Sequence, residues 1–197
     1  MQEIMEILNF KENRLICIGG KPVSGKTMLL LKIAKEVALN SKIRAILFSL
    51  EASKEYVSKI MGDNEKEGIV ANLIINDTPR ISINEIKEKC YSLKKEKNIG
   101  LILIDYLQLI TSNKKYSSVE QEEKAIVLEL QELSKQLNIP VIITSQIKGE
   151  SGVPSLFDVT RNIRKYFDDI FLLYKEDENR KIIVAKRKVW KIRNDNL

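Results

Sequence analysis

Short runs of β-branched and other apolar residues alternate along this chain with longer segments whose apolar residues recur at helical spacing. That alternation is typical of a mostly parallel β-sheet covered by helices, so the pattern predicts an α/β fold. Strands buried on both faces are continuously apolar, and residues 101–104 and 141–143 have that character. The predicted strands comprise residues 14–19, 44–49, 73–76, 101–105, 141–144, 170–174 and 181–185.

Helix signals fill the intervals between these strands. One predicted helix, residues 26–39, directly follows the first strand. A Ser82-x-x-Glu85 capping box begins a second helix that ends near residue 97, and Ser118 begins a third that Pro140 stops. The apolar positions of the third helix share one face: Ile126, Leu130, Leu133 and Leu137.

The composition narrows the possible chemistry. A length of 197 residues favours one domain over residues 1–197, with short flexible ends at 1–10 and 189–197. The chain has no histidine, which excludes histidine triads, histidine bases and the common zinc sites. Cys17 and Cys90 lie in apolar-patterned segments without metal-ligand spacing, so we expect reduced core cysteines.

Charge and hydropathy bear on location and partners. The net charge of +6 mildly favours a polyanionic partner. No apolar run approaches the roughly 18–20 residues that a membrane span needs, and the first residues do not resemble a secretory signal. We therefore expect a cytoplasmic protein with no membrane attachment.

A glycine-rich loop joins the first predicted strand to the first predicted helix, with the pattern Gly20-x-x-x-x-Gly25-Lys26-Thr27. Glycines let backbone N–H groups converge on phosphate oxygens, and the following helix directs its positive N-terminal end at the same point. The pattern places Lys26 on the β- and γ-phosphates and the Thr27 hydroxyl on Mg²⁺, so it predicts a site for ATP and Mg²⁺. The expected nucleotide-binding residues are Gly20, Lys21, Pro22, Val23, Ser24, Gly25, Lys26, Thr27 and Met28.

Polar side chains follow three other predicted strands. Asp105 ends one of them, where an acid can hold the magnesium shell through water, but Tyr106 occupies the next position, where many ATPases carry a catalytic carboxylate. Glu51 lies just past the second strand and is the candidate for activating water, because ligands gather beyond the carboxyl ends of such strands. The alternative is that Glu51 is an ordinary carboxylate in the first turn of a helix. Gln146 ends a further strand. Its side chain either senses the γ-phosphate by hydrogen bonding or is that of an exposed loop residue.

Several segments together resemble one family, the ATPase domain of the DnaB-type replicative helicases, which has a RecA-like fold. The matching segments are GGKPVSGKT, FSLEASKEYVSKIMG, NDTPRISINEIKEK, LILIDYLQLI, LNIPVIITSQI, DDIFLLY and IIVAKRK. They occur in family order from about residue 15 to residue 188, and IDYLQL and SLE are the most specific. The resemblance implies that Glu51 is the catalytic carboxylate, Asp105 the Walker B acid, and Gln146 the link from the γ-phosphate to the DNA loops.

The resemblance also implies a contribution from a neighbouring subunit. In the family a Lys-x-Arg pair on a late strand reaches the neighbour's nucleotide, and such a group contributes about 10³–10⁵ in rate. Here Lys186 matches the lysine, while Lys188 occupies the arginine position and lacks its planar fork. Arg187 could compensate after a one-residue slip. A homo-oligomeric ring, a hexamer as in the family, is the assembly expected.

Three turn-like stretches, residues 63–68, 111–117 and 148–154, are predicted working loops. The second coincides with a DNA-facing loop of the family, and the family's second DNA loop shrinks here to residues 147–153. The run KRKVWKIR places five cations around Trp190, either as a single-strand contact or as a solvated tail. The candidate DNA-binding residues are Lys114, Lys115, Lys148, Arg161 and Arg164. Arg161 and Arg164 form a cluster with Lys165, which is either a helix face that lines a channel or an ordinary charged face.

Three functions remain open from the sequence. The first is an ATP-dependent helicase or translocase that moves single-stranded DNA in DNA replication. The second is a nucleotide-binding accessory module with little or no hydrolysis that interacts with replication proteins. Lys188, the short second DNA loop and the lack of most of the family's linker segment favour it. The third is a recombinase-type ATPase with the same fold.

Overall fold

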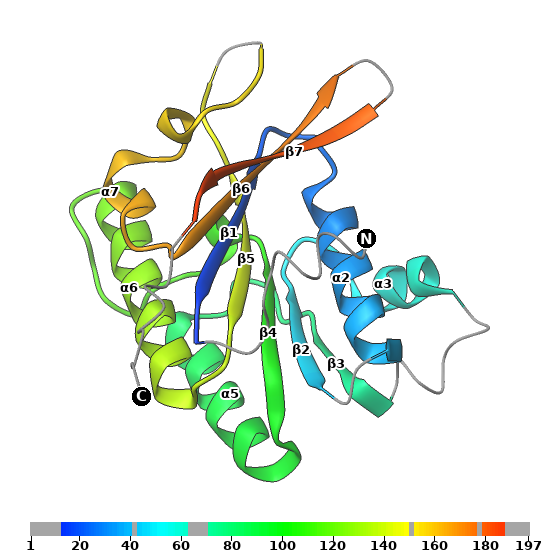
Figure 1. The fold of residues 1–197 in the computed structure, drawn as a ribbon. Helices are drawn as coiled ribbons and strands as arrows, with labels where there is room; N and C mark the ends of the chain where they lie inside the picture. The colour runs from blue at the N-terminus through cyan, green and yellow to red at the C-terminus, as the bar shows by residue number, and fades with distance from the viewer. Residues whose placement is uncertain (1–12, 41–42, 63–70, 150–151, 177–178, 188–197) are drawn as a thin grey trace, which may run out of the picture.

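The computed structural model describes residues 13–40, 43–62, 71–149, 152–176 and 179–187. These residues form a seven-stranded sheet in the order β3-β2-β4-β5-β1-β6-β7, with helices on both faces (Figure 1). Six neighbouring strands are parallel, and β7 pairs antiparallel with β6 at one edge. The mostly parallel α/β fold predicted from the hydrophobic pattern is confirmed.

Each predicted strand and helix is present among the described residues. The strands are β1 (Leu15–Gly20), β2 (Arg44–Ser49), β3 (Leu73–Asn76), β4 (Ile99–Asp105), β5 (Val141–Gln146), β6 (Asp169–Glu176) and β7 (Asn179–Lys186). The helices are α2 (Lys26–Asn40), α3 (Lys54–Met61), α5 (Ile83–Lys97), α6 (Val119–Leu137) and α7 (Arg161–Arg164), with 3-10 turns η2 (Leu107–Leu109) and η3 (Leu156–Asp158). None of these helices is long and apolar enough to cross a membrane.

Local side-chain bonds fix where the helices begin and end. The Ser82 hydroxyl accepts from the Glu85 N–H at 3.3 Å and the Glu85 carboxylate accepts from the Ser82 N–H at 2.9 Å, which confirms the capping box. Helix α6 begins after Ser118 as expected, but it ends at Leu137, with Asn138 as its cap, before Pro140 is reached. Asn138 adopts the left-handed conformation at φ 53°, which terminates a helix before the proline is reached.

The sheet separates two hydrophobic cores. Leu15 and Cys17 of β1 pack with α5 and α6, whereas the alternating Ile16 and Ile18 pack with α2 and α3. Both faces of β1 are therefore covered, as its continuous apolar sequence predicts. Cys17 and Cys90 are free and buried, and burial raises the pKa of each thiol to about 12, so both stay protonated at neutral pH.

The expectation of a single domain stays a prediction. Its proposed flexible ends at 1–10 and 189–197 lie outside the described residues, as does the predicted loop 63–68.

A buried ion pair ties the start of β1 to the start of β6. The Arg14 guanidinium lies 2.8 Å from an Asp169 carboxylate oxygen, and their side chains are only 6% and 2% exposed. The Leu15 N–H donates to the neighbouring Asp168 carboxylate at 3.0 Å. Removing one member of such a pair leaves the other charge buried, which is costly.

We predict that Asp169→Asn lowers the free energy of unfolding by about 3 kcal/mol, because the Arg14 charge loses its buried counter-charge. The melting temperature should fall by roughly 6–12 °C. Glu176→Gln is the matched control, since Glu176 pairs with Lys181 in an exposed position and its loss should cost less than about 1 kcal/mol. Equal melting temperatures for the two variants would contradict the prediction.

Candidate functional site

The carboxyl ends of four adjacent strands meet at one edge of the sheet, at the top of Figure 1. In the parallel register Gly20 lies beside Gln146, and Ser49 lies beside Asp105. The Leu50 N–H also donates to the Asp105 carbonyl at 2.8 Å, which joins the segment carrying Glu51 to the end of β4. Residues far apart in the sequence are therefore brought together at this edge, as the parallel topology requires.

The loop between β1 and α2 is closed by contacts that need glycine. A Cβ atom on Gly20 would lie 2.4 Å from the Ser24 hydroxyl and 2.8 Å from the Leu173 carbonyl, so no larger residue fits there. Gly25 has φ +95°, a conformation that favours glycine, and its carbonyl starts α2 by accepting from the Leu29 N–H. These contacts shape the loop that the glycine pattern predicts.

The Lys26 ammonium lies inside this loop. It donates to the Lys21 carbonyl at 2.8 Å, so the side chain folds back over the loop. Burial lowers the pKa of Lys26, and the carboxylates of Asp105 and Glu51 partly oppose that shift. The ammonium is thus held where an anionic ligand in the loop would meet it.

A cavity of about 740 Å³ opens against the loop. Its lining includes much of the predicted nucleotide-binding stretch: Pro22, Val23, Gly25, Lys26, Thr27 and Met28. Glu51 and Gln146 line it from the ends of β2 and β5, as the sequence predicts. Gly20, Lys21, Ser24 and Asp105 do not belong to its lining, and Ser24 and Asp105 are buried.

The Asp105 carboxylate is 2% exposed and only half satisfied. The Thr144 hydroxyl donates to Oδ1, whereas Oδ2 has no hydrogen-bond partner among the described residues. The buried Ser24 hydroxyl is in the same condition. Unsatisfied buried oxygens are costly, so these two atoms suit a ligand, here water of a cation shell or phosphate.

These residues fit a magnesium ion bound with a nucleotide. The described residues contain no cluster of three or more His, Cys, Asp or Glu side chains that could hold a metal by themselves. Mg²⁺ in nucleotide sites needs none, because it takes one or two protein oxygens together with phosphate oxygens and water. The Thr27 hydroxyl and the free Asp105 oxygen provide that limited set.

Tyr106 and Gln108 were not predicted as site residues from the sequence. Tyr106 lines the cavity, and burial raises the pKa of its hydroxyl, reinforced by the charges of Glu51 and Asp105. Gln108 accepts from the Gln146 N–H at 3.2 Å and donates to the Ser145 hydroxyl at 3.1 Å. Both residues belong to the IDYLQL segment, whose specificity was the signal that could have identified them.

Gln108 also connects the cavity edge to α6. Burial raises the pKa of the Glu123 carboxyl, and a hydrogen bond with the Gln108 side chain partly offsets that effect. Glu123 is next to Lys124, so one amide side chain contacts both the end of β5 and the first half of α6.

Lys186, the lysine predicted to act on a neighbouring subunit, lies in a different region. The Lys186 ammonium donates to the carbonyls of Arg164, Lys165 and Phe167, at the end of α7. It does not line this chain's own cavity, and its proposed action on a neighbouring subunit stays a prediction. Arg187 is exposed, while Lys188 and Trp190 lie outside the described residues.

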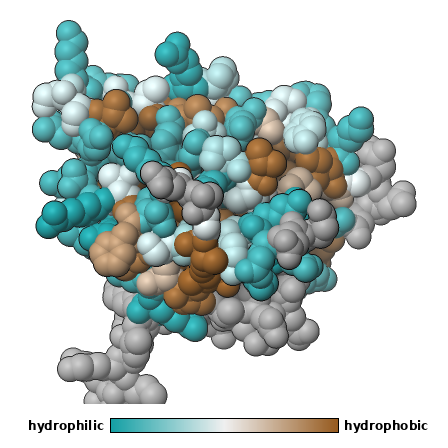
Figure 2. Space-filling model, turned by 90° about the horizontal axis from the view of Figure 1, so that it is seen from above, coloured by the Kyte–Doolittle hydropathy of each residue, from teal (hydrophilic) through white to brown (hydrophobic). Residues whose placement is uncertain are grey.

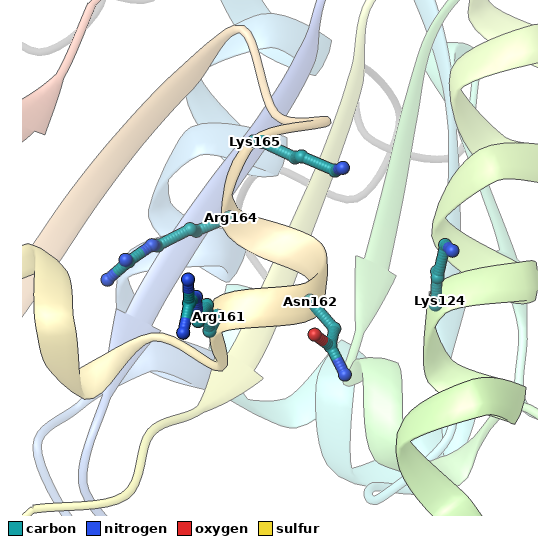
Figure 3. A pocket seen from close by; sticks show the side chains of 5 residues that line it. All are labelled: Lys124, Arg161, Asn162, Arg164 and Lys165. Atoms are coloured by element: carbon teal, nitrogen blue, oxygen red, sulfur yellow. The ribbon is translucent and has the colours of Figure 1, made fainter.

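Two of the candidate DNA-binding residues share a second cavity. This cavity of about 370 Å³ is lined by Lys124 of α6 and by Arg161, Asn162, Arg164 and Lys165 of α7 and its end (Figure 3). Four of these five side chains are cationic and none is acidic. The cluster of Arg161, Arg164 and Lys165 was predicted from the sequence, and the cavity adds Lys124.

The other predicted cations are less concentrated. Lys114 and Lys115 are exposed in the loop after β4, and Lys148 is exposed with its ammonium 3.8 Å from Glu120. Figure 2 shows the molecule from above, with hydrophilic side chains over much of this face and separate apolar patches between them. Of the candidate DNA-binding residues, Arg161 and Arg164 are therefore the ones that line a common cavity, between α6 and α7.

Known structures share this fold. One solved ATPase domain superposes with a TM-score of 0.80 at 23% identity, covering 95% of this chain and 82% of that domain. A DnaB-like replicative helicase, solved in a study of its interactions with primase, also superposes with a TM-score of 0.80 at 24% identity, covering 95% of this chain and 56% of the other. At these identities the likeness establishes the fold, and it confirms the RecA-like architecture expected from the sequence.

Sequence comparison establishes the family. The replicative DNA helicase DnaC of Bacillus subtilis (strain 168) is 31% identical over 221 residues, covering 91% of this chain and 49% of that protein. The chain thus spans about half of the length of this curated relative. The family model for the DnaB-like helicase C terminal domain matches residues 4–66 and 57–195. With nearly its whole length matched, this chain belongs to the DnaB-like helicase C-terminal domain family.

Proposed function

We propose that this chain is the ATPase core of a replicative DNA helicase or translocase. It would bind ATP with Mg²⁺ in the cytoplasm, hydrolyse it, and couple hydrolysis to movement along single-stranded DNA during replication. The observation that carries the proposal is the cavity shared by Lys26, Glu51 and Gln146, with the Asp105 carboxylate buried beside it. Family membership supports the same function.

Nucleotide binding would use the loop as a preformed cradle. Its backbone N–H groups and the start of α2 attract the phosphates, and Lys26 turns its ammonium from the Lys21 carbonyl to their oxygens. That exchange is favourable because a hydrogen bond between two charged groups is stronger than one to a neutral carbonyl. Bound Mg²⁺ would neutralise phosphate charge, held by the Thr27 hydroxyl and, through water, by Asp105.

Hydrolysis would use Glu51 to orient and deprotonate the attacking water. Glu51 is on the cavity wall and exposed, so a water between it and the terminal phosphate is sterically accessible. The Ser49 hydroxyl donates to the Ala52 carbonyl at 2.6 Å and so holds the turn that carries Glu51. Lys26 would stabilise the negative charge that moves onto the phosphate oxygens.

Coupling to DNA would run through Gln146 and Gln108. Gln146 lines the cavity, its backbone is held by the Gln108 side chain, and Gln108 also contacts Glu123 of α6. The next residue, Lys124, lines the cationic cavity, where phosphates of a single strand would bind. A change at the γ-phosphate would therefore reach the DNA side through the Gln108 side chain and the backbone of α6.

One observation favours the accessory module as a second candidate. Lys186 matches the family's trans-acting lysine, yet its ammonium is bonded to carbonyls of its own chain. A ring that needs this cation at a neighbour's nucleotide would have to break those bonds. DNA-independent, slow turnover by a single chain would support the module, whereas DNA-stimulated turnover by a ring, a hexamer as in the family, would support the motor.

We predict that Lys26→Ala weakens MgATP affinity at least about tenfold, since the phosphates lose a charged hydrogen-bond donor.

Glu51→Gln should retain binding and lower the hydrolysis rate by about 10²–10⁴, the contribution of a general base. Fluorescent-nucleotide titration and phosphate release measure the two effects. Lys32→Ala, on the exposed side of α2, is the charge-matched control. Undiminished nucleotide affinity in Lys26→Ala would sink the proposal.

We predict that Arg161→Ala combined with Arg164→Ala weakens binding to oligo-dT, with little effect on ATP affinity. The slope of log K against log salt should decrease by about 0.7 for each phosphate that the protein no longer neutralises. Lys94→Ala combined with Lys95→Ala removes the same charge from α5 and should leave DNA binding unchanged. Sedimentation velocity with each nucleotide reports whether a ring forms. Identical salt slopes for the two double variants would place the DNA elsewhere.

A further inference from the structure

Arg180 is a cation in the nucleotide cavity to which the motifs assign no role. It lies near the start of β7, paired with Lys175 of β6, and its side chain is part of the cavity lining. In Figure 1 the β6–β7 hairpin extends over the loop between β1 and α2. The hairpin thus brings a residue from late in the sequence to the phosphate loop of the same chain.

The Arg180 side chain touches the loop directly. A Cβ atom on Gly25 would lie 2.6 Å from the Arg180 Nε atom and 3.1 Å from its Cδ atom. The guanidinium therefore lies against the bare Cα of Gly25, the residue immediately before Lys26. Any side chain at position 25 would push the guanidinium away, in addition to straining the backbone at φ +95°.

No carboxylate forms an ion pair with this guanidinium within the described part of the chain. The adjacent cation on β7, Lys181, behaves differently, since it pairs with Glu176. Successive residues of a strand point to opposite faces, which explains why Arg180 faces the cavity and Lys181 does not. A guanidinium that no described carboxylate pairs with, at the edge of a glycine loop, has the planar donors that phosphate oxygens accept.

We propose that Arg180 binds the phosphates of the nucleotide held by its own chain. This assignment rests on the proposed nucleotide-binding function, and it adds a cis cation to Lys26 at the phosphate loop. The position is distinct from that of Lys186, whose ammonium is at the far end of β7 on the carbonyls of α7. Arg180 is exposed, so its replacement should leave the fold intact.

The test compares Arg180→Ala with Lys181→Ala, which removes the same charge from the next position of the strand. ATP, ADP and AMP are titrated into each protein with Mg²⁺. Arg180→Ala should weaken ATP binding about tenfold to a hundredfold, the range for a hydrogen bond to a charged group. The loss should be smaller for ADP and close to none for AMP. Arg180→Lys should recover part of the affinity, because lysine restores charge without the fork.

A second measurement separates action in cis from action on a neighbour. The same titrations are run at a protein concentration where sedimentation shows single chains and at one where it shows assemblies. Action in cis gives the same fold-loss in both conditions. A loss seen only in assemblies would overturn the cis assignment.

The outcomes also separate this inference from the proposed function. An intact protein that binds ATP, with Lys26→Ala defective and Arg180→Ala equal to Lys181→Ala, overturns the role of Arg180 alone. An equal loss for ATP, ADP and AMP overturns the phosphate contact and moves Arg180 to the nucleoside. An intact protein that binds no nucleotide overturns the proposed function itself.

Discussion

Six parallel strands force every connection that follows a strand to leave the sheet at the same edge, and the site depends on that constraint. A parallel pair needs a long crossover, so the helices between strands cover the two faces and leave this edge to the loops. The paired positions Gly20–Gln146 and Ser49–Asp105 then bring a loop, an amide and a carboxylate into one small space. A one-residue slip of β4 against β2 would turn Asp105 to the other face of the sheet.

At the carboxyl ends of the strands, one ammonium group and two carboxylates lie close together, which suits an anionic ligand that carries a cation. The Lys26 ammonium is partly desolvated, and a backbone carbonyl is its only direct hydrogen-bond partner in the described residues. Asp105 retains a buried oxygen that no described residue satisfies, and Glu51 faces the same cavity. Buried polar groups without a protein partner are costly, so a ligand that hydrogen-bonds to them gains free energy on binding.

Much of this could be predicted from the sequence, and the remainder depended on packing. The seven strands, the capped helices and the glycine loop follow from local patterns, since apolar periodicity and capping chemistry act over a few residues. The end of α6 was not predicted, because Asn138 adopts a left-handed conformation and caps the helix before Pro140 is reached. The contact of Arg180 with Gly25 was not predicted either, because it depends on how the β6–β7 hairpin folds over the loop. Lys124 joined the cationic cavity for the same reason, as α6 and α7 meet only in the folded chain.

Strand β7 contacts two separate regions, the glycine loop at one end and the residues that end α7 at the other. Arg180 near its start touches the phosphate loop, and Lys186 at its end is bonded to the residues that close α7. An extended strand is nearly inextensible along its length, at about 3.3 Å per residue, so it behaves as a rod rather than a spring. The antiparallel ladder to β6 also fixes the register of β7, so the strand moves with its hairpin rather than along it. The outermost strand of the sheet thus gives the glycine loop and the residues that end α7 one shared, rigid support.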